Sequence, residues 1–326
     1  MSPQRGRRPP TGRVPRAGRD PAHHGLAELK RLLARAGVKP SRRLGQNFMI
    51  DPNLVRYLVK QADLFPGEVV LEVGAGTGIL TAGLASAGAR VVGVEVDRRL
   101  AGVLQERFGD ERLVTVLAAS ALDRSREVSP AVAKEIGNAM RLFGATQFAV
   151  VSNLPYCCAT PFLASLASSP LAWRTALVTV QREVGERLAA EPGSKVYGTA
   201  SVLVQTGAKV EMMRRIPPAV FWPRPEVESA LLRLRPIYRR SFDPRAFAAF
   251  VRGLFSHRRK QLGAALRHAG YALTGASRFD LEARPEEFSP EAFVEMFGHA
   301  KKAAAGKAQD LRKRPLPPGK GAAAHR

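Results

Sequence analysis

A glycine-rich turn between an apolar run and a helical pattern limits the fold of this chain more than any other segment. The segment Val69–Thr81 reads VVLEVGAGTGILT, so Gly74, Gly76 and Gly78 directly follow the apolar run. Glycine permits a tight turn and lets a ligand approach the backbone closely. A strand, a glycine-rich turn and a helix in this order are typical of parallel α/β folds.

Strand and helix patterns alternate around this turn. The pattern predicts a helix over Ile79–Ala87 and strands over Glu68–Val73, Arg90–Glu95, Leu113–Leu117, Gln147–Val151 and Thr175–Val180. The pattern changes around Arg233–Pro236, and from Pro244 onward it is helical, with apolar residues at Phe247, Phe250, Val251 and Leu254. We expect a doubly wound α/β domain with a mostly parallel sheet over 41–238, and a smaller helical domain over 239–299. The boundary falls near Ile237–Asp243.

The charge of the chain is concentrated at its two ends. Lys and Arg number 51 against 28 acidic residues, a net charge of +23. Residues 1–43 hold 12 Lys and Arg with two acids, and residues 300–326 hold eight with one acid. Composition predicts that the flanks, 1–40 and 300–326, are largely disordered, apart from a short amphipathic helix over Leu26–Arg35. They are either arms that hold RNA non-specifically or solvated tails.

Composition excludes several classes of protein. Cys157 and Cys158, which are the two cysteines of the chain, rule out a disulfide scaffold or a multi-cysteine zinc site, and the six histidines show no metal-ligand spacing. Residues 142–173 are uncharged and long enough to span a bilayer, but the prolines within them favour a strand, a loop and a helix. No signal-peptide core is present at the N-terminus, so we expect a cytoplasmic protein without a metal or a membrane partner.

The spacing within the turn indicates the cofactor. The glycines follow G-x-G-x-G, and Ile79 stands where the dinucleotide fingerprint requires its third glycine. With the acidic residue Glu72 ahead of it, this spacing favours S-adenosylmethionine over a nicotinamide site or a plain tight turn. Glu95 follows Gly74 by 21 residues at the end of the next strand. There it is either an acceptor for both ribose hydroxyls or a surface acid.

The segment Ser152-Asn153-Leu154-Pro155-Tyr156 follows a buried strand and predicts the reaction. An exocyclic adenine amine is a poor nucleophile because its lone pair is delocalised into the ring. The Asn153 side-chain oxygen and the Leu154 carbonyl can accept its two hydrogens, which turns the lone pair toward a methyl donor. Pro155 stiffens the turn, and Tyr156 can stack on the base. The alternative is an ordinary Asn-Pro turn.

From Ser41 to Phe297 the chain resembles the ribosomal RNA adenine dimethyltransferases that modify small-subunit rRNA. Eight ordered segments carry the resemblance: LGQNFMID (Leu44–Asp51), EVGAGTG (Glu72–Gly78), VEVD (Val94–Asp97), SNLPY (Ser152–Tyr156), QREVGERL (Gln181–Leu188), KVYGTASV (Lys195–Val202), PPAVFWPRPEVESA (Pro217–Ala230) and FSHRRK (Phe255–Lys260). The family fold is a class I methyltransferase domain with a small helical domain, as the periodicity indicates independently.

The resemblance also implies roles for individual residues. The cofactor contacts that it implies are Gln46, Asn47, the backbone at Met49, Gly74 and Glu95. We also expect Gly76 of the glycine turn and Asn153 to contact the cofactor. The resemblance makes Asn153 the catalytic asparagine and places Tyr156 and Phe221 in an aromatic clamp. One position departs from the family: Ser120 stands where an aspartate usually bonds the cofactor adenine, and Asp123 is a nearby substitute. The segment 121–146 is longer than usual.

Basic residues outside the cavity motifs are candidate RNA contacts. We expect Arg258, Arg259 and Lys260 on the helix of the second domain, where they either contact rRNA phosphates or form a solvated helix face. Arg224 lies between two prolines in a loop that either presents Phe221 or simply connects two elements around a buried Phe221.

Three functions are compatible with these features. We expect a monomer that dimethylates two adjacent adenines of small-subunit rRNA within an immature small subunit. The resistance-type relatives that methylate large-subunit rRNA share the glycines and N-L-P-Y, but the segments at Phe221–Ala230 and Phe255–Lys260 favour the small-subunit group. A non-catalytic ribosome-assembly or RNA-binding factor is the third possibility, and Ser120 is the feature that supports it.

Overall fold

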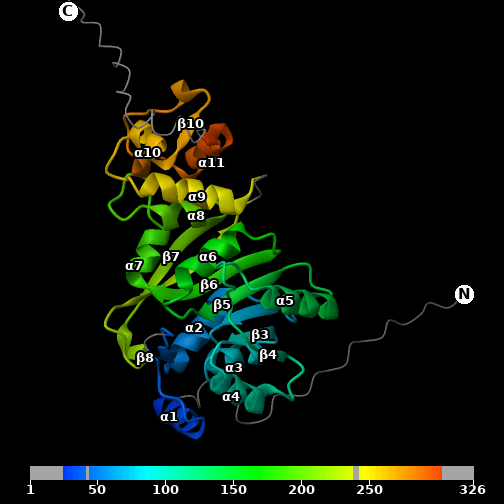
Figure 1. Cartoon of the computed structure of the whole chain (residues 1–326). Coiled ribbons are helices and arrows are strands. Elements are labelled where there is room, and N and C mark those ends of the chain that lie inside the picture. Colours follow the sequence, from blue (N-terminus) through cyan, green and yellow to red (C-terminus); the bar gives the residue numbers. More distant parts are fainter. Residues whose placement is uncertain (1–24, 42–43, 238–241, 303–326) are drawn as a thin grey trace, which may run out of the picture.

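A computed structural model describes residues 25–41, 44–237 and 242–302 of the 326-residue chain (Figure 1). The predictions for residues 1–24 and 303–326 lie outside the described residues. The centre of the molecule is a seven-stranded sheet, with the C-terminal helices gathered at one end and the helix α1 (Leu26–Arg35) at the other.

The sheet is mostly parallel, as predicted. Its strand order is β4-β3-β2-β5-β6-β9-β7. The first five of these strands run parallel to one another: β4 (Val114–Ala118), β3 (Arg90–Glu95), β2 (Val69–Val73), β5 (Phe148–Asn153) and β6 (Trp173–Gln181). The remaining two, β9 (Ser229–Pro236) and β7 (Ala208–Ile216), are antiparallel to their neighbours. The predicted doubly wound α/β architecture is therefore confirmed.

Helices cover both faces of the sheet because its central strands are apolar on both sides. The core on one face includes residues of α2 (Pro52–Ala62), α3 (Ile79–Ser86) and α4 (Arg98–Phe108). The core on the other face includes residues of α5 (Pro130–Phe143), α6 (Ala159–Ser168), α7 (Arg182–Leu188) and α8 (Thr199–Gln205). Alternate residues of β2 follow this division, since Val69 and Leu71 pack on the second face and Val70 packs on the first.

The C-terminal part contains α9 (Pro244–Phe255), α10 (Leu262–Ala269) and α11 (Pro290–His299), with a small hairpin of β10 (Tyr271–Leu273) and β11 (Ala300–Lys302). Two single 3-10 turns, η3 (Ala276–Arg278) and η4 (Pro285–Glu287), connect these elements. The four residues that the helical spacing singled out in α9 are buried in the core of this part. Tyr197 and Val202 belong to the same core, and the Tyr197 hydroxyl donates to the Phe288 carbonyl at 3.0 Å. The core of the C-terminal part therefore extends into the segment before the domain boundary that we expected near Ile237–Asp243.

The predicted strands and helices are present, with ends that differ by at most two residues. The predicted helix over Leu26–Arg35 has the expected bounds, but Leu29 and Leu33 pack against Leu100 of α4. This helix is the exception that was predicted within the largely disordered extension expected over 1–40, and it packs against the α/β domain. By contrast, Ala300–Lys302 pairs in the hairpin and is not part of a tail. The uncharged stretch forms β5 and α6, and the described part of the chain has no helix long and apolar enough to cross a membrane.

Candidate active site

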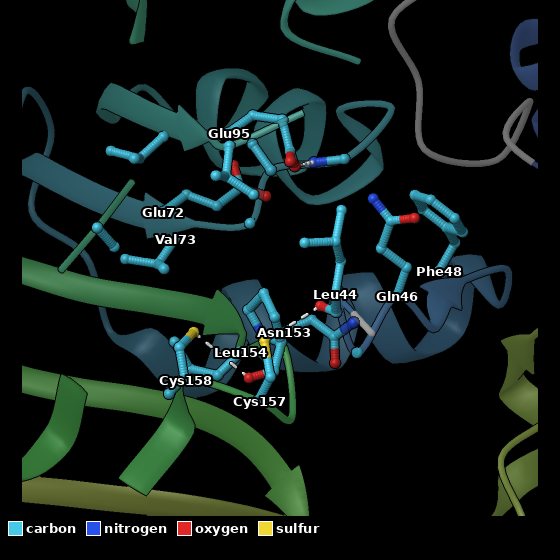
Figure 2. Close-up of a pocket in the computed structure, with 18 of the residues that line it drawn as sticks. Leu44, Gln46, Phe48, Glu72, Val73, Glu95, Asn153, Leu154, Cys157 and Cys158 are labelled. Carbon is cyan, nitrogen blue, oxygen red and sulfur yellow. Dashed lines mark hydrogen bonds between the residues drawn. The ribbon is translucent and has the colours of Figure 1, made fainter. Parts of the chain in front are cut away.

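A cavity of about 260 Å³ lies at the carboxyl ends of the central parallel strands. Figure 2 shows Glu72 and Glu95 on one side of it and Asn153 with Leu154 on the opposite side. The segment from Leu44 to Met49 forms a third wall. Such a position, outside the carboxyl edge of an open α/β sheet, is where this type of fold binds its ligands.

The glycine-rich turn forms the floor of the cavity, and its backbone conformation and close packing against other residues require glycine. Gly74, Gly76 and Gly78 have φ angles of 73°, 59° and 85°. A Cβ on Gly74 would lie 2.6 Å from Cγ of Pro155, and one on Gly78 would lie 2.5 Å from the Phe108 ring. Both contacts are too short, so close packing against the protein adds to the ligand approach predicted from the sequence.

Glu95 ends β3 at the cavity wall and is 4% exposed. Its Oε2 accepts from the Gly76 N–H and its Oε1 from the Asp97 N–H, both at 2.9 Å. Burial raises the pKa of Glu95, and the backbone hydrogen bonds oppose that rise. Each oxygen retains a lone pair, so the held carboxylate can still accept hydroxyl hydrogens at the cavity.

Glu72 is a second carboxyl group in the same wall and is absent from the residues predicted to bind the cofactor. It is 2% exposed, and its Oε2 accepts from the Thr81 hydroxyl at 2.6 Å. Burial, together with the nearby charge of Glu95, raises the pKa of Glu72 to about 8 against the opposing hydrogen bonds from Thr81. Its position before the first glycine was noted in the sequence, and its location on the cavity wall could have been inferred from that position.

The N-terminal wall comes from the segment that the resemblance assigned to the cofactor. Its residues Gln46, Asn47 and Met49 all line the cavity, and β1 (Phe48–Met49) pairs with β8 (Phe221–Trp222). Oε1 of Gln46 accepts from the Ser41 N–H at 2.9 Å, whereas its Nε2 is buried with no partner among the described residues. A buried donor without a partner is costly, so this amide fits a ligand acceptor.

Asn153 connects the cavity wall to two distant segments. Its Nδ2 donates to the Asn47 carbonyl at 2.9 Å, and its Oδ1 accepts from the Thr179 hydroxyl. A carbonyl can only accept, so the contact with Asn47 fixes which way the amide points. The Leu154 N–H donates to the Thr179 carbonyl at 3.2 Å. Oδ1 keeps a second lone pair, which can accept a substrate hydrogen.

The predicted aromatic clamp is only half present at the cavity. Tyr156 lines it, and its hydroxyl is 2.8 Å from Oγ of Ser229, which anchors the ring. Burial raises the pKa of Tyr156, so the hydroxyl stays neutral. Phe221 is 2% exposed and packs in the core that also holds Met49, because the pairing of β8 with β1 draws it inward. Phe221 does not line the cavity in this structure, and its position matches the alternative of a connecting loop with a buried Phe221; its contact with the base stays a prediction.

Ser120 and Asp123 both lie in the loop after β4, but only Ser120 lines the cavity. Ser120 lines the cavity, is exposed, and donates its hydroxyl to the Leu122 carbonyl at 2.6 Å. Asp123 instead accepts from the Glu127 N–H at 3.0 Å and so holds a turn away from the cavity wall. Ser120 is therefore the better placed of the two to meet a ligand.

The cysteines also reach the cavity, which the sequence did not indicate. Both are free thiols; Cys157 is exposed and its Sγ donates to the Leu44 carbonyl at 3.3 Å. Burial raises the pKa of Cys158 to about 12, so this thiol is unreactive at neutral pH. Among the described residues, no cluster of three or more His, Cys, Asp and Glu could hold a metal ion.

The predicted RNA contacts lie outside the cavity. Arg224 is exposed in the loop after β8. Arg258, Arg259 and Lys260 are exposed too, but α9 ends at Phe255, so they occupy the turn after the helix and not the helix itself. Arg258 donates to the Lys195 carbonyl at 3.4 Å, which links this turn to the segment before α8.

The chain has relatives of known name over most of its length. The family model for ribosomal RNA adenine dimethylase matches residues 37–301. Ribosomal RNA small subunit methyltransferase A of Streptomyces avermitilis is 39% identical over 257 residues, which cover 78% of this chain and 83% of that protein. The protein of the same name from Moorella thermoacetica is 36% identical over a stretch that covers 81% of this chain and 93% of that protein.

Two solved structures share the fold. The crystal structure of the 23S rRNA methyltransferase ErmE is 23% identical with a TM-score of 0.54, and covers 78% of this chain and 99% of that one. A dimethyladenosine transferase from Plasmodium falciparum is 19% identical with a TM-score of 0.59 and the same coverage. At these identities the likeness concerns the fold alone. The family match and the curated relatives, both of which span the cavity residues, show that the chain belongs to the ribosomal RNA adenine dimethylase family.

Proposed function

We propose that the protein transfers methyl groups from S-adenosylmethionine to the exocyclic amines of two adjacent adenines in small-subunit rRNA. The observation that carries the proposal is the amide of Asn153, which lines the cavity and is held in place by the Asn47 carbonyl and the Thr179 hydroxyl. The family and its curated small-subunit relatives favour this substrate over large-subunit rRNA.

The cavity residues fit the cofactor. The buried Nε2 of Gln46 provides a donor without a partner among the described residues, and Glu95 provides a fixed acceptor for ribose hydroxyls. Gly74, Gly76, the Asn47 side chain and the Met49 backbone complete the proposed cofactor wall, and Ser120 on the cavity wall would meet the adenine. When bound, S-adenosylmethionine supplies a methyl group on a positively charged sulfur. The carboxylate of Glu95 favours such a cation, and Glu72 does so once it has lost its proton.

Positioning explains the reaction without a general base. Asn153 Oδ1 and the Leu154 carbonyl accept the two hydrogens of the target amine, which directs its lone pair toward the methyl group. Pro155 packs against Gly74 and holds this pair of acceptors beside the cofactor wall. Tyr156 stacks on the extruded base. The amine becomes acidic only after it has been methylated, so its proton leaves to solvent.

We further propose that a single copy acts in the cytoplasm on an immature small subunit. One chain supplies all the residues named in the cavity. The adjacent free thiols suit a reducing compartment. Residues 239–299 form the proposed rRNA-recognition domain, with Arg258, Arg259 and Lys260 in an exposed turn and Arg224 on the loop nearer the cavity.

Incubation with isotope-labelled cofactor and undermethylated small subunits tests the proposal. We expect label in two adjacent adenines of small-subunit rRNA, each carrying two methyl groups. Label in large-subunit rRNA would overturn the substrate assignment. If no rRNA is labelled although the protein binds the particle, the chain is a non-catalytic assembly factor, the alternative that Ser120 supports.

A further inference from the structure

The antiparallel end of the sheet presents a charged face beside α2. On β9, Leu231 packs in the core that α2 covers, so Arg233 and Arg235, two and four residues later, point to the same side. Lys209 and Glu211 on β7 pair with Arg235 and Arg233, and Arg214 pairs with Leu231, so they share that side. We call Lys209, Arg214, Arg233 and Arg235, together with the acid Glu211, the basic sheet face.

Helix α2 borders this face without covering it. The Arg214 guanidinium lies 5.0 Å from the centre of the Tyr57 ring, and Arg233 donates to the Gln61 carbonyl at 2.9 Å. Lys209, Arg214 and Arg235 are exposed to solvent. The acid Glu211 is 3.8 Å from Arg235 and leaves most of the positive charge uncompensated.

Protection of a sheet edge does not account for this charge. Charged residues on an edge strand prevent unwanted pairing, and β7 is such a strand. However, β9 lies inside the sheet and still carries two arginines on the same face. The opposite edge strand, β4, reads VTVLA and has no charge. Four of the five cations on β7 and β9 therefore lie on one face of this end of the sheet, and Arg215, which pairs with Ala230, lies on the other.

We infer that the basic sheet face binds the phosphate backbone of the RNA substrate, at a surface distinct from the cavity and from the turn at Arg258. This inference rests on the proposed function. Guanidinium groups match phosphate oxygens in geometry and charge. Lys209 and Arg214 lie about 17 Å apart along an extended strand, enough to contact several successive phosphates.

The orientation of β7 connects this face to the active site. Ile216, the last residue of β7, pairs with Ser229, whose hydroxyl is bonded to Tyr156 at the cavity. The Arg214 end is thus nearer the cavity and the Lys209 end farther from it. The Tyr57 ring is covered by Arg214, so the face offers no open aromatic platform for a base. Contact with the backbone, independent of sequence, follows from this chemistry.

The test uses the full chain with Lys209→Gln, Arg214→Gln and Arg235→Gln combined, and undermethylated small subunits as the probe. Arg233 is left intact because it holds α2. Each lost phosphate contact lowers the slope of log K against log salt by about 0.7–0.9, so we expect a decrease of about two. Because this slope difference acts over one decade of salt below 1 M, the dissociation constant should rise about 100-fold at 0.1 M salt. The methylation rate at saturating particle should stay within about two-fold.

A matched triple variant separates this surface from the overall charge. Arg112→Gln, Arg124→Gln and Lys134→Gln remove the same charge from exposed positions around β4 and α5. We expect this control to lower the slope by less than half as much. Equal slopes for both triple variants, or an unchanged slope for the first, would overturn the inference. Wild-type protein that binds the particle without methylating it would instead overturn the proposed function, and the comparison of slopes would still stand.

Discussion

The two halves of the cavity are held in different ways. On the cofactor side, Glu95 is fixed by N–H groups of Gly76, 19 residues before it, and Asp97, two residues after it. On the target side, Asn153 is fixed by Asn47, 106 residues before it, and by Thr179 on the neighbouring strand. The first arrangement is local to one strand–turn–helix unit, whereas the second exists only when three segments have assembled.

This difference predicts different failures. A change on the cofactor side should alter the affinity for S-adenosylmethionine, because backbone groups keep the rest of that wall in place. A change on the target side should alter the rate, because the acceptor oxygens work only at one position relative to the methyl group.

The strongest test is Asn153→Ala. It removes an acceptor that is aligned with the target amine in the transition state, so the turnover rate should fall by about 10²–10³. Cofactor affinity should stay within a few-fold, because Glu95 and the glycine turn remain. Calorimetry and single-turnover methylation measure the two quantities. Lost cofactor binding with retained turnover would reverse the assignment of the two halves.

Thr179→Val is the graded companion of that variant. It keeps the shape of the side chain and removes only the hydroxyl that donates to Asn153. A neutral hydrogen bond is worth about 0.5–1.5 kcal/mol, so we expect a loss of about five-fold in rate. A rate equal to that of the wild type would mean that Asn47 alone orients the amide.

The sequence predicts the local half of the site better than the assembled half. Buried strands such as Arg90–Glu95 appear as apolar runs, and the glycine spacing places Glu95 beside the turn without knowledge of distant contacts. The contact between Thr179 and Asn153 has no comparable signal. The burial of Phe221 depends on the pairing of β8 with β1, which the sequence does not indicate, so its contact with the base stays a prediction.

The antiparallel strands were missed for a physical reason as well. The segment AKVEMMRRI of β7 places most of its charged residues on the face that no helix covers, and a bulge near Met213 interrupts its alternation. A pattern based on apolar periodicity therefore does not indicate a strand there. Helix α5 begins with Ser129 as its cap and Pro130 at its first turn, a start signal within the segment that the sequence left unassigned.

Glu95→Ala tests the cofactor side. The lost acceptor is charged and buried, and such a hydrogen bond is worth about 1.5–3 kcal/mol, so the cofactor dissociation constant should rise about ten-fold or more. Asp97→Asn is the control, since it removes a charge two residues away and preserves the cap of α4. If both variants weaken cofactor binding equally, the loss of negative charge alone accounts for the effect, and Glu95 does not contact the cofactor directly.

The pH dependence of binding tests Glu72. Its pKa of about 8 in the free protein means that it is mostly protonated at pH 7. A cationic ligand favours the carboxylate, so binding releases a proton below pH 8, and affinity should rise up to about ten-fold per pH unit before it levels off above pH 8. The uncharged thioether product should show a weaker dependence. Glu72→Gln should flatten the curve, and an unchanged curve in that variant would assign the titration to another group.

The smallest expected effect concerns Ser120, which lies at the cofactor side but lacks a charge. Ser120→Asp should add a charge-assisted hydrogen bond to the adenine amine, about 1 kcal/mol stronger than a neutral one, and tighten binding about five-fold. Burial of a new carboxylate would oppose this gain, but Ser120 is exposed, so the desolvation cost is small. The Leu122 N–H, 3.2 Å from Oγ of Ser120, can bond the new carboxylate and keep the loop in place.

Titration of cofactor into both proteins measures the change in affinity. The control Asp123→Ala should leave affinity unaltered because Asp123 only holds the turn at Glu127. Weaker binding by Ser120→Asp together with a costly Asp123→Ala would show that the loop rearranges when the cofactor binds and that Asp123, not Ser120, meets the adenine.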